Sequence, residues 1–281
     1  MWMRLLVGQL VQRAAAEKMR TVVTDALRGE MQREPATPVE PCEIAVIFAL
    51  NAESGALTDL LQESQYAQRA TFVERSGLLD GRRLVVAEVG VGIEAAAQGT
   101  ADCLAVHRPQ WVISAGFAGG LVPELKKGHM LMANEIVDLV GHTLQTGLKL
   151  DLASDSPGLH VGRLLTVDRL IREPEEKRLL AEQHAAVACD MESIAVAEVC
   201  RQAGVRFMSV RVVSDTVDDR LPKEIELLLA ETSLLGKLGT AANAVLNRFS
   251  AASDMWQLYE DALKCSQRLA RFVRSMLPQL S

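Results

Sequence analysis

Acidic residues stand where predicted strands end and predicted helices begin. Glu53 opens a helical stretch after the first long apolar run. Asp190 and Glu192 precede another helical stretch, and Asp215 ends the apolar run 206–215. Open α/β sheets bind ligands outside the carboxyl ends of their strands, and a carboxylate at the end of a buried strand needs a partner or a task. For Glu192, a solvated acid favoured by the helix dipole is the alternative.

Two glycine-rich turns follow predicted strands. Gly90-x-Gly92-x-x-Ala95 resembles a dinucleotide-binding turn, which also requires an acidic residue about 20 positions on, at the end of the next strand. That strand ends in residues 115–117, Ala-Gly-Phe, and the turn follows the second strand instead of the first. A nicotinamide oxidoreductase is therefore disfavoured. The second turn, residues 116–120, indicates either a tight strand-to-helix connection or a backbone that approaches a ligand closely.

Short apolar runs alternate with helical stretches, which is typical of a sheet covered by helices. Strands are predicted at 43–50, 82–89, 110–116, 129–137, 161–167 and 206–215. Helices are predicted at 53–64, 93–107, 175–184 and 192–204. Because the strands are continuously apolar, they fit a sheet buried on both faces. The expected fold is a three-layer α/β domain with a mostly parallel central sheet, plus N- and C-terminal helices.

The chain divides into three predicted parts. Residues 1–41 form a helical extension with a Pro-rich linker, 42–250 a catalytic domain, and 251–281 a C-terminal amphipathic helix. The C-terminal stripe comprises Met255, Leu258, Tyr259, Ala262, Leu263, Leu269, Ala270, Val273 and Leu277. Such a stripe predicts packing against another helix or subunit, and so a homo-oligomer. Packing on its own domain is the alternative.

Composition limits the partners. The net charge of −6 and an aromatic content of 4% argue against nucleic acid, so a small molecule is expected. The five cysteines and five histidines lack metal-ligand spacing, so no metal is expected. No apolar run reaches the ~18 residues of a membrane span, and residues 1–20 do not resemble a signal peptide. The protein is predicted to be cytoplasmic, with no membrane partner.

Four sequence blocks together carry a family resemblance. They are AL-x-x-E (49–53), AGFAGGL-x-x-x-L-x-x-G (115–128), CDMES-x-A-x-A-x-V (189–199) and RVVSDTVDD (211–219). In this order they resemble the purine nucleoside phosphorylase superfamily, and within it the 5′-methylthioadenosine/S-adenosylhomocysteine nucleosidase branch. The resemblance implies a nucleoside phosphorylase-like fold over roughly three-quarters of the chain and a nucleoside as the small-molecule partner.

The resemblance assigns roles to four polar residues. Asp215 aligns with the general acid that protonates or hydrogen-bonds the purine at N7, and Ser214 with a residue that orients it. Glu192 aligns with the glutamate that binds the ribose hydroxyls. Glu53 aligns with the glutamate that activates the attacking water in the nucleosidases. For Asp215 to hold a proton near pH 7 it must be buried.

Other positions of the expected pocket agree only in part. Gly119, Ile171 and Met191 align with residues that line the nucleoside site. Phe117 stands where the nucleosidases commonly have serine, and Leu170 where a phenylalanine normally stacks on adenine. The segment after Asp138 matches no substrate lid.

The expected reaction is hydrolysis of a purine nucleoside, with adenine as the expected base and a 5′ substituent, and without metal or organic cofactor. An acid must protonate the leaving base while a base activates water, and two carboxylates share these tasks when their surroundings push their pKa values apart. The strand-end loops LNAE and VGVGIE contain no Arg, Ser or Thr to hold phosphate. The alternatives are a phosphorylase with an unconventional phosphate site and a non-catalytic nucleoside-binding or scaffolding protein.

Overall fold

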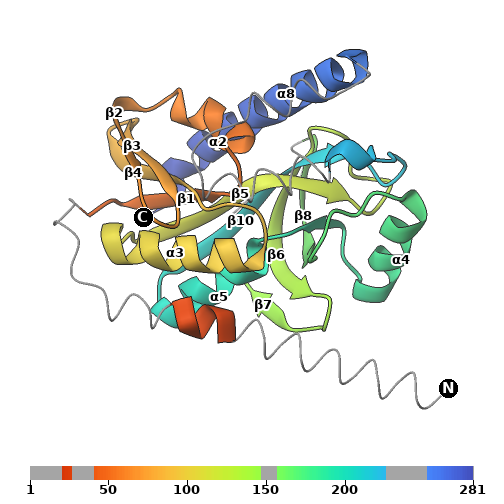
Figure 1. Cartoon of the computed structure of the whole chain (residues 1–281), viewed down its shortest axis with the longest axis horizontal. Coiled ribbons are helices and arrows are strands. Elements are labelled where there is room, and N and C mark those ends of the chain that lie inside the picture. The colour runs from red at the N-terminus through yellow and green to blue at the C-terminus, as the bar shows by residue number, and fades with distance from the viewer. Residues whose placement is uncertain (1–20, 27–40, 147–156, 226–251, 281) are drawn as a thin grey trace.

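The computed structural model describes residues 21–26, 41–146, 157–225 and 252–280 (Figure 1). Its strands are β1 (Ile44–Phe48), β2 (Gln62–Gln68), β3 (Val73–Leu79), β4 (Arg82–Glu88), β5 (Trp111–Gly120), β6 (Met130–Asp138), β7 (Thr143–Gln145), β8 (Leu159–Thr166), β9 (Ala188–Asp190) and β10 (Arg206–Asp215). Its helices are α2 (Asn51–Thr58), α3 (Ile93–His107), α4 (Pro174–His184), α5 (Ser193–Ala203) and α8 (Ala252–Met276), followed by the 3-10 helix η2 (Leu277–Gln279). Residues 21–26 are also helical.

The sheet is mixed, which corrects the expectation of a mostly parallel one. The strand order is β10-β6-β8-β9-β5-β1-β4-β3-β2, with β7 paired to β6 and β10 paired to β5 as well. That extra pairing closes β5, β10, β6, β8 and β9 into a ring. The parallel pairs are β1–β4, β1–β5, β5–β10, β6–β8 and β8–β9. The other five described pairs, β2–β3, β3–β4, β5–β9, β6–β7 and β6–β10, are antiparallel.

Helices cover the two faces of the sheet (Figure 1). On one face α2 and α8 pack over an apolar core that includes Val46, Ile113 and Leu269. On the other, α3 and α5 pack over a second core, to which Val23 and Ala26 of the N-terminal helical segment contribute. The layered arrangement leaves the carboxyl ends of β1, β5 and β10 on one edge, where the acidic residues lie.

The predicted elements differ from the observed ones mainly between residues 53 and 79. The predicted helix 53–64 ends at Thr58, and an antiparallel hairpin of β2 and β3 follows. The residues of β2 are exposed except for one that is partly buried, so its polar sequence lacks the apolar alternation that marks a strand. β9 has three residues and is too short to be recognised from its sequence.

The apolar stripe of α8 is buried within its own chain from Cys265 onward. Leu269, Val273 and Met276 are almost inaccessible to solvent, and Leu263 is 42% exposed. From Cys265 onward, α8 therefore has no exposed apolar stripe that would require a second subunit to cover it. Self-association remains a prediction.

Some expectations fall outside the described residues. They concern residues 1–20, the linker 33–40, much of the segment after Asp138, residues 226–251 and the side chains of Met255, Leu258 and Tyr259. Among the helices that are described, none is both long and apolar enough to cross a membrane.

Candidate active site

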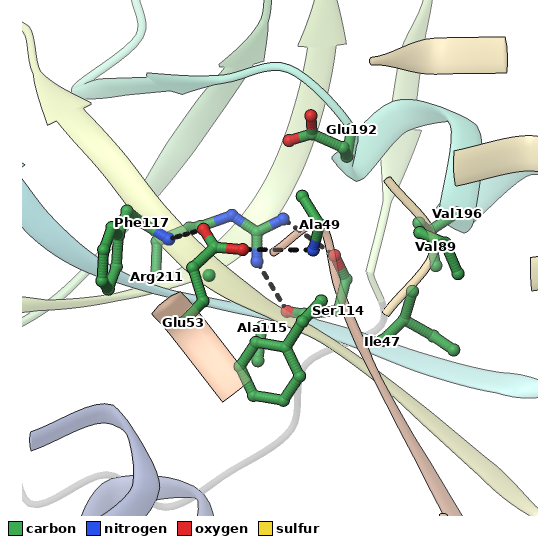
Figure 2. Close-up of a pocket in the computed structure, with 12 residues that line it drawn as sticks. Ile47, Ala49, Glu53, Val89, Ser114, Ala115, Phe117, Glu192, Val196 and Arg211 are labelled. Carbon is green, nitrogen blue, oxygen red and sulfur yellow. Dashed lines mark hydrogen bonds between the residues drawn. The ribbon is translucent and has the colours of Figure 1, made fainter. Parts of the chain in front are cut away.

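A pocket opens at the carboxyl ends of β1 and β5, beside the start of α5. Its lining consists of Ile47, Phe48, Ala49, Glu53, Val89, Ser114, Ala115, Gly116, Phe117, Glu192, Val196 and Arg211. In Figure 2 the carboxylate of Glu53 lies beside the guanidinium of Arg211, and Glu192 reaches the pocket from the start of α5. The structure thus brings two of the three predicted catalytic carboxylates together, although the second lies 139 positions after the first in the chain.

Glu53 is held by the backbone. Its Oε2 accepts hydrogen bonds from the N–H groups of Ala49 (3.1 Å) and Leu50 (3.0 Å), and its Oε1 accepts one from Phe117 (2.7 Å). A Cβ at Gly116 would lie only 2.8 Å from Oε1, so the absence of a side chain there makes room for the carboxylate. Burial raises the pKa of Glu53 although these N–H groups and the Arg211 charge oppose it. A raised pKa makes the carboxylate a stronger base at neutral pH.

Glu192 caps the beginning of α5. Its Oε1 accepts a hydrogen bond from Gly92 N–H (2.7 Å) and its Oε2 one from Met191 N–H (3.2 Å). Gly92 has φ 93°, a conformation that favours glycine. The Gly90–Ala95 turn, which resembles a dinucleotide-binding turn in sequence, therefore binds the carboxylate of Glu192 through its Gly92 N–H. Burial, with the negative charges of Asp190 and Glu53, raises the pKa of Glu192 to about 8.

Arg211 is a central residue of the site that the sequence analysis did not assign. The side chain is buried, and its Nε and Nη2 donate to Asp190 Oδ2 (3.0 and 2.7 Å). Nη1 donates to the carbonyls of Ser114 and Val210, and Nη2 also to the hydroxyls of Ser114 and Ser193. All five guanidinium N–H groups therefore have protein acceptors. An arginine inside an apolar strand was the signal that could have identified it, because a buried charge must be paired.

Asp215 is buried at the end of β10, outside the lining of this pocket. Its Oδ1 accepts a hydrogen bond from Ser214 Oγ (2.7 Å). Its Oδ2 accepts one from Lys177 Nζ (2.5 Å), a partner that the sequence analysis missed. A Cβ at Gly119 would lie 3.1 Å from that oxygen. Gly116, next to Glu53, and Gly119, next to Asp215, both belong to β5. Glu53 and Asp215 therefore both lie at the carboxyl end of β5.

The remaining predicted pocket residues lie beyond Asp215. Ile171 is buried in an apolar cluster with Cys189, against which Met191 packs. Cys189 Sγ would lie 3.5 Å from a Cβ at Gly119, so this cluster adjoins the place where Asp215 sits. Leu170 is partly buried beside it.

Phe117 contributes to the site chiefly through its backbone. Its N–H donates to Glu53, while its ring packs against the core between the sheet and α8. α8 also fixes the helix that carries Glu53, because Ser266 Oγ donates to the Glu53 carbonyl (2.9 Å) and accepts from Ala56 N–H (3.3 Å). The C-terminal helix therefore supports the site from behind.

The arrangement combines two carboxylates of raised pKa with a third that is ion-paired. No group of His, Cys, Asp and Glu among the described residues could hold a metal ion. The five cysteines are buried and free. Carboxylates in such surroundings can activate water and stabilise a cationic sugar.

The sequence model of the phosphorylase superfamily matches residues 43–158 and 142–249, most of the chain. The chain belongs to the phosphorylase superfamily. Among superfamily members, the 5′-methylthioadenosine/S-adenosylhomocysteine nucleosidase of Geobacillus thermodenitrificans is 27% identical over 215 residues, which cover 66% of this chain and 89% of that protein. The nucleosidase of the same name from Shewanella loihica is 24% identical over 213 residues, covering 67% and 93%.

Solved structures of the superfamily share the fold. The 5′-methylthioadenosine/S-adenosylhomocysteine nucleosidase of Helicobacter pylori, crystallised with a pyrrolidine inhibitor, has a TM-score of 0.65 at 20% identity and covers 86% of this chain and 100% of its own. The futalosine hydrolase of the same organism has a TM-score of 0.59 at 20% identity, covering 85% and 98%. These likenesses establish the nucleoside phosphorylase-like α/β fold.

Proposed function

We propose that this protein hydrolyses the N-ribosidic bond of a purine nucleoside, with adenine as the base and a substituent at the 5′ position. The carrying observation is that Glu53 and Glu192, both of raised pKa, line one pocket whose arginine is fully engaged by the protein. The names of the curated relatives support the substrate class.

Each carboxylate has a part in the proposed reaction. Glu53 takes the proton of the attacking water, and Glu192 binds the ribose hydroxyls. Asp215, oriented by Ser214, protonates or hydrogen-bonds N7 of the leaving base. Cleavage gives an oxocarbenium-like sugar, whose developing positive charge the Glu53 carboxylate stabilises. Gly119, Ile171 and Met191 contact the nucleoside in this proposal.

Hydrolysis is favoured over phosphorolysis by the charges of the pocket. Arg211 is the only cationic residue of the pocket lining, and Asp190, Ser114, Ser193 and a backbone carbonyl take all its N–H groups. Phosphate is bound by donors that are free to reach it. The Glu53 carboxylate in the same lining also repels an anion.

A nucleoside panel tests the proposal, with base release and the sugar product measured with and without phosphate. We expect free purine and a reducing sugar at a rate independent of phosphate. A sugar 1-phosphate, at a rate rising with phosphate, would move the protein to phosphorolysis. Nucleoside binding without base release would indicate the non-catalytic alternative.

The Asp215→Asn variant tests the acid. It should lose on the order of 10²–10⁴ in base release while binding nucleoside nearly as before, because a positioned acid contributes that much to the rate. Asp218→Asn is the matched control. Asp218 lies in the turn that follows Asp215, is exposed, and pairs with Arg178 of α4. Near wild-type turnover of Asp215→Asn would contradict the assignment.

We also propose that the protein is cytoplasmic and forms a homo-oligomer. Five free, buried cysteines fit the reducing cytoplasm, and cell fractionation tests this. A homo-oligomer is tested by light scattering.

A further inference from the structure

Lys177 is a fully buried lysine, with 0% of its surface exposed. It lies in the first turns of α4, and its Nζ donates to Asp215 Oδ2 (2.5 Å) and to the carbonyls of Thr216 (2.8 Å) and Asp219 (3.0 Å). The three N–H groups of an ammonium thus have three acceptors. A buried ammonium is costly unless it is paired and hydrogen-bonded in this way.

The acceptors of Lys177 all belong to Asp215 and the turn that follows it. That turn is closed by Asp219 Oδ2, which accepts from the N–H (2.8 Å) and the hydroxyl (2.9 Å) of Thr216. Lys177 therefore fixes both the carboxyl oxygen and the backbone that carries it. The adjacent Arg178 differs: it is half exposed and pairs with the exposed Asp218.

We propose that Lys177 is a positioning residue for the leaving-group acid: it holds the carboxyl of Asp215 against Gly119 and neutralises it in the buried site. The inference rests on the proposed function, in which Asp215 serves the leaving base. Ser214 holds one carboxyl oxygen and Lys177 the other, so both are fixed before substrate binds. Such preorganisation raises the rate of the chemical step more than it changes binding.

Lys177 also supplies the charge that faces Asp215. The other titratable groups near this carboxyl are the thiols of Cys189 on β9 and Cys265 on α8, both with pKa values raised by burial, and Asp219, which Lys127 approaches. Neither thiol offers a positive charge. Removing the ammonium therefore leaves the Asp215 carboxyl without its counter-charge and with Ser214 as its one remaining side-chain hydrogen-bond donor among the described residues.

The experiment compares Lys177→Met and Lys177→Arg, with Arg178→Met as the matched control. For Lys177→Met we expect kcat to fall on the order of 10–100-fold with KM little changed, because the acid is misplaced while the pocket is kept. Lys177→Arg keeps the charge and should rescue part of kcat. Arg178→Met should match the wild type in both kcat and KM. A folded Lys177→Met enzyme with wild-type kcat, or a loss confined to KM, would overturn the inference.

A double-mutant cycle with Asp215→Asn separates positioning from a structural role. If Lys177 acts through Asp215, Lys177→Met should change kcat little further in the Asp215→Asn background; full additivity would contradict this. Should Lys177→Met fail to fold, the double variant, which carries neither charge, is expected to fold with a higher Tm than either single variant. An absence of that thermal coupling would also overturn the inference. If the wild type releases no base, the proposed function fails, and the thermal cycle still reports on the pair.

Discussion

Two clusters differ in what surrounds their glutamate carboxylates. The first comprises Glu53 and Glu192, and we name it the catalytic cluster after its proposed role. It is held by backbone N–H groups and shares its one nearby cation, Arg211, with Asp190. The paired cluster consists of Glu74, His107 and Arg69, near the C-terminus of α3. There Glu74 Oε2 lies 2.6 Å from His107 Nε2, and Arg69 Nη2 donates to Oε1 at 2.8 Å.

The pKa values of the two clusters move in opposite directions. Burial raises the pKa of Glu53 and Glu192. At Glu74 burial acts in the same direction, but hydrogen bonds from His107 and Arg69 outweigh it and lower the pKa. Glu53 and Glu74 are both almost inaccessible to solvent, so burial alone does not set the direction of the shift, and the partners decide. At Glu74 hydrogen-bonded side chains hold both carboxylate oxygens, whereas Glu53 and Glu192 line the pocket without such partners of their own and keep raised pKa values, as functional carboxylates often do.

The largest expected effect is on turnover, at Glu53. Glu53→Gln should lower kcat on the order of 10²–10⁴-fold, because the attacking water then lacks its base. Its stability should fall by roughly 1–3 kcal/mol, because the amide has one accepting oxygen and its NH2 group would face a backbone N–H that a carboxylate oxygen accepts in the wild type. Single-turnover kinetics with the best nucleoside of the panel measure the effect. Wild-type turnover of Glu53→Gln would remove the distinction between the two clusters.

The next effect is on stability, at Glu74, where the same substitution is the matched control. Glu74→Gln should lower the free energy of unfolding by ~3 kcal/mol at pH 7, because it removes one partner of a buried ion pair. Its kcat and KM should equal the wild-type values. Urea unfolding and the nucleoside assay together check this. A large loss of turnover in the folded variant would place Glu74 with the catalytic cluster.

The sequence predicted much of this arrangement from local signals. The apolar runs that became β1, β4, β5 and β10 were recognisable, and α3 was predicted with its observed ends. Glu53 and Glu192 were found because each begins a helix after a strand, which is a local pattern. The α/β architecture follows from the alternation of these elements.

The missing parts depend on contacts that are distant in the chain. The strand β2 exists through its pairing with β3, and its own residues are polar and exposed. Lys177 lies in the charged sequence EEKR, where nothing distinguishes it from Arg178 until Asp215, 38 positions later, is placed beside it. The sequence indicated that Asp215 should be buried and would need a partner or a task, but not which residue would pair with it. Long-range pairing of this kind requires the fold.

The free energy of unfolding should depend on pH with opposite signs in the two clusters. The pKa of Glu192 rises from 4.5 to about 8, so the native state binds an extra proton between these values and its stability falls as pH rises through this window. Glu192→Gln should flatten the decline, by up to ~1.4 kcal/mol per pH unit before solvent screening of this partly buried group. Glu53, whose pKa is also raised, keeps part of the slope.

Urea unfolding at pH 5, 7 and 8.5 measures the difference between wild type and Glu192→Gln. Glu74 contributes with the opposite sign: its lowered pKa gives stability that is present above 4.5 and lost as pH falls through the lower folded value. Glu74→Gln should thus leave the decline between pH 5 and 8.5 as in the wild type. Equal slopes for wild type and Glu192→Gln would show that Glu192 is not held in the protonated form.

The smallest effect on turnover is expected from deleting residues 1–40. The deletion tests whether the side of the molecule that holds the paired cluster can lose stability while kcat and KM stay unchanged. Val23 and Ala26 are buried in the core with Cys42, Phe72 and Cys103. That core adjoins the paired cluster: Cys42 N–H donates to the His107 carbonyl (3.1 Å), and the charge of Glu74 adds to the effect of burial in raising the pKa of the Cys42 thiol. Removing Val23 alone forfeits ~1.5–3 kcal/mol of apolar burial.

We therefore expect the truncated protein to unfold at a lower urea concentration with unchanged kcat and KM, because the catalytic cluster takes no support from these residues in the described structure. Val23→Ala in the full chain is the control: it removes part of the same contact and should give part of the same loss. Light scattering on both forms tests the prediction of self-association. A smaller assembly after truncation, with activity that falls on dilution, would show that the extension bridges subunits and that the site depends on the partner. An unchanged assembly with lower stability assigns residues 21–26 to local packing, on the side of the sheet where the carboxylates serve the fold.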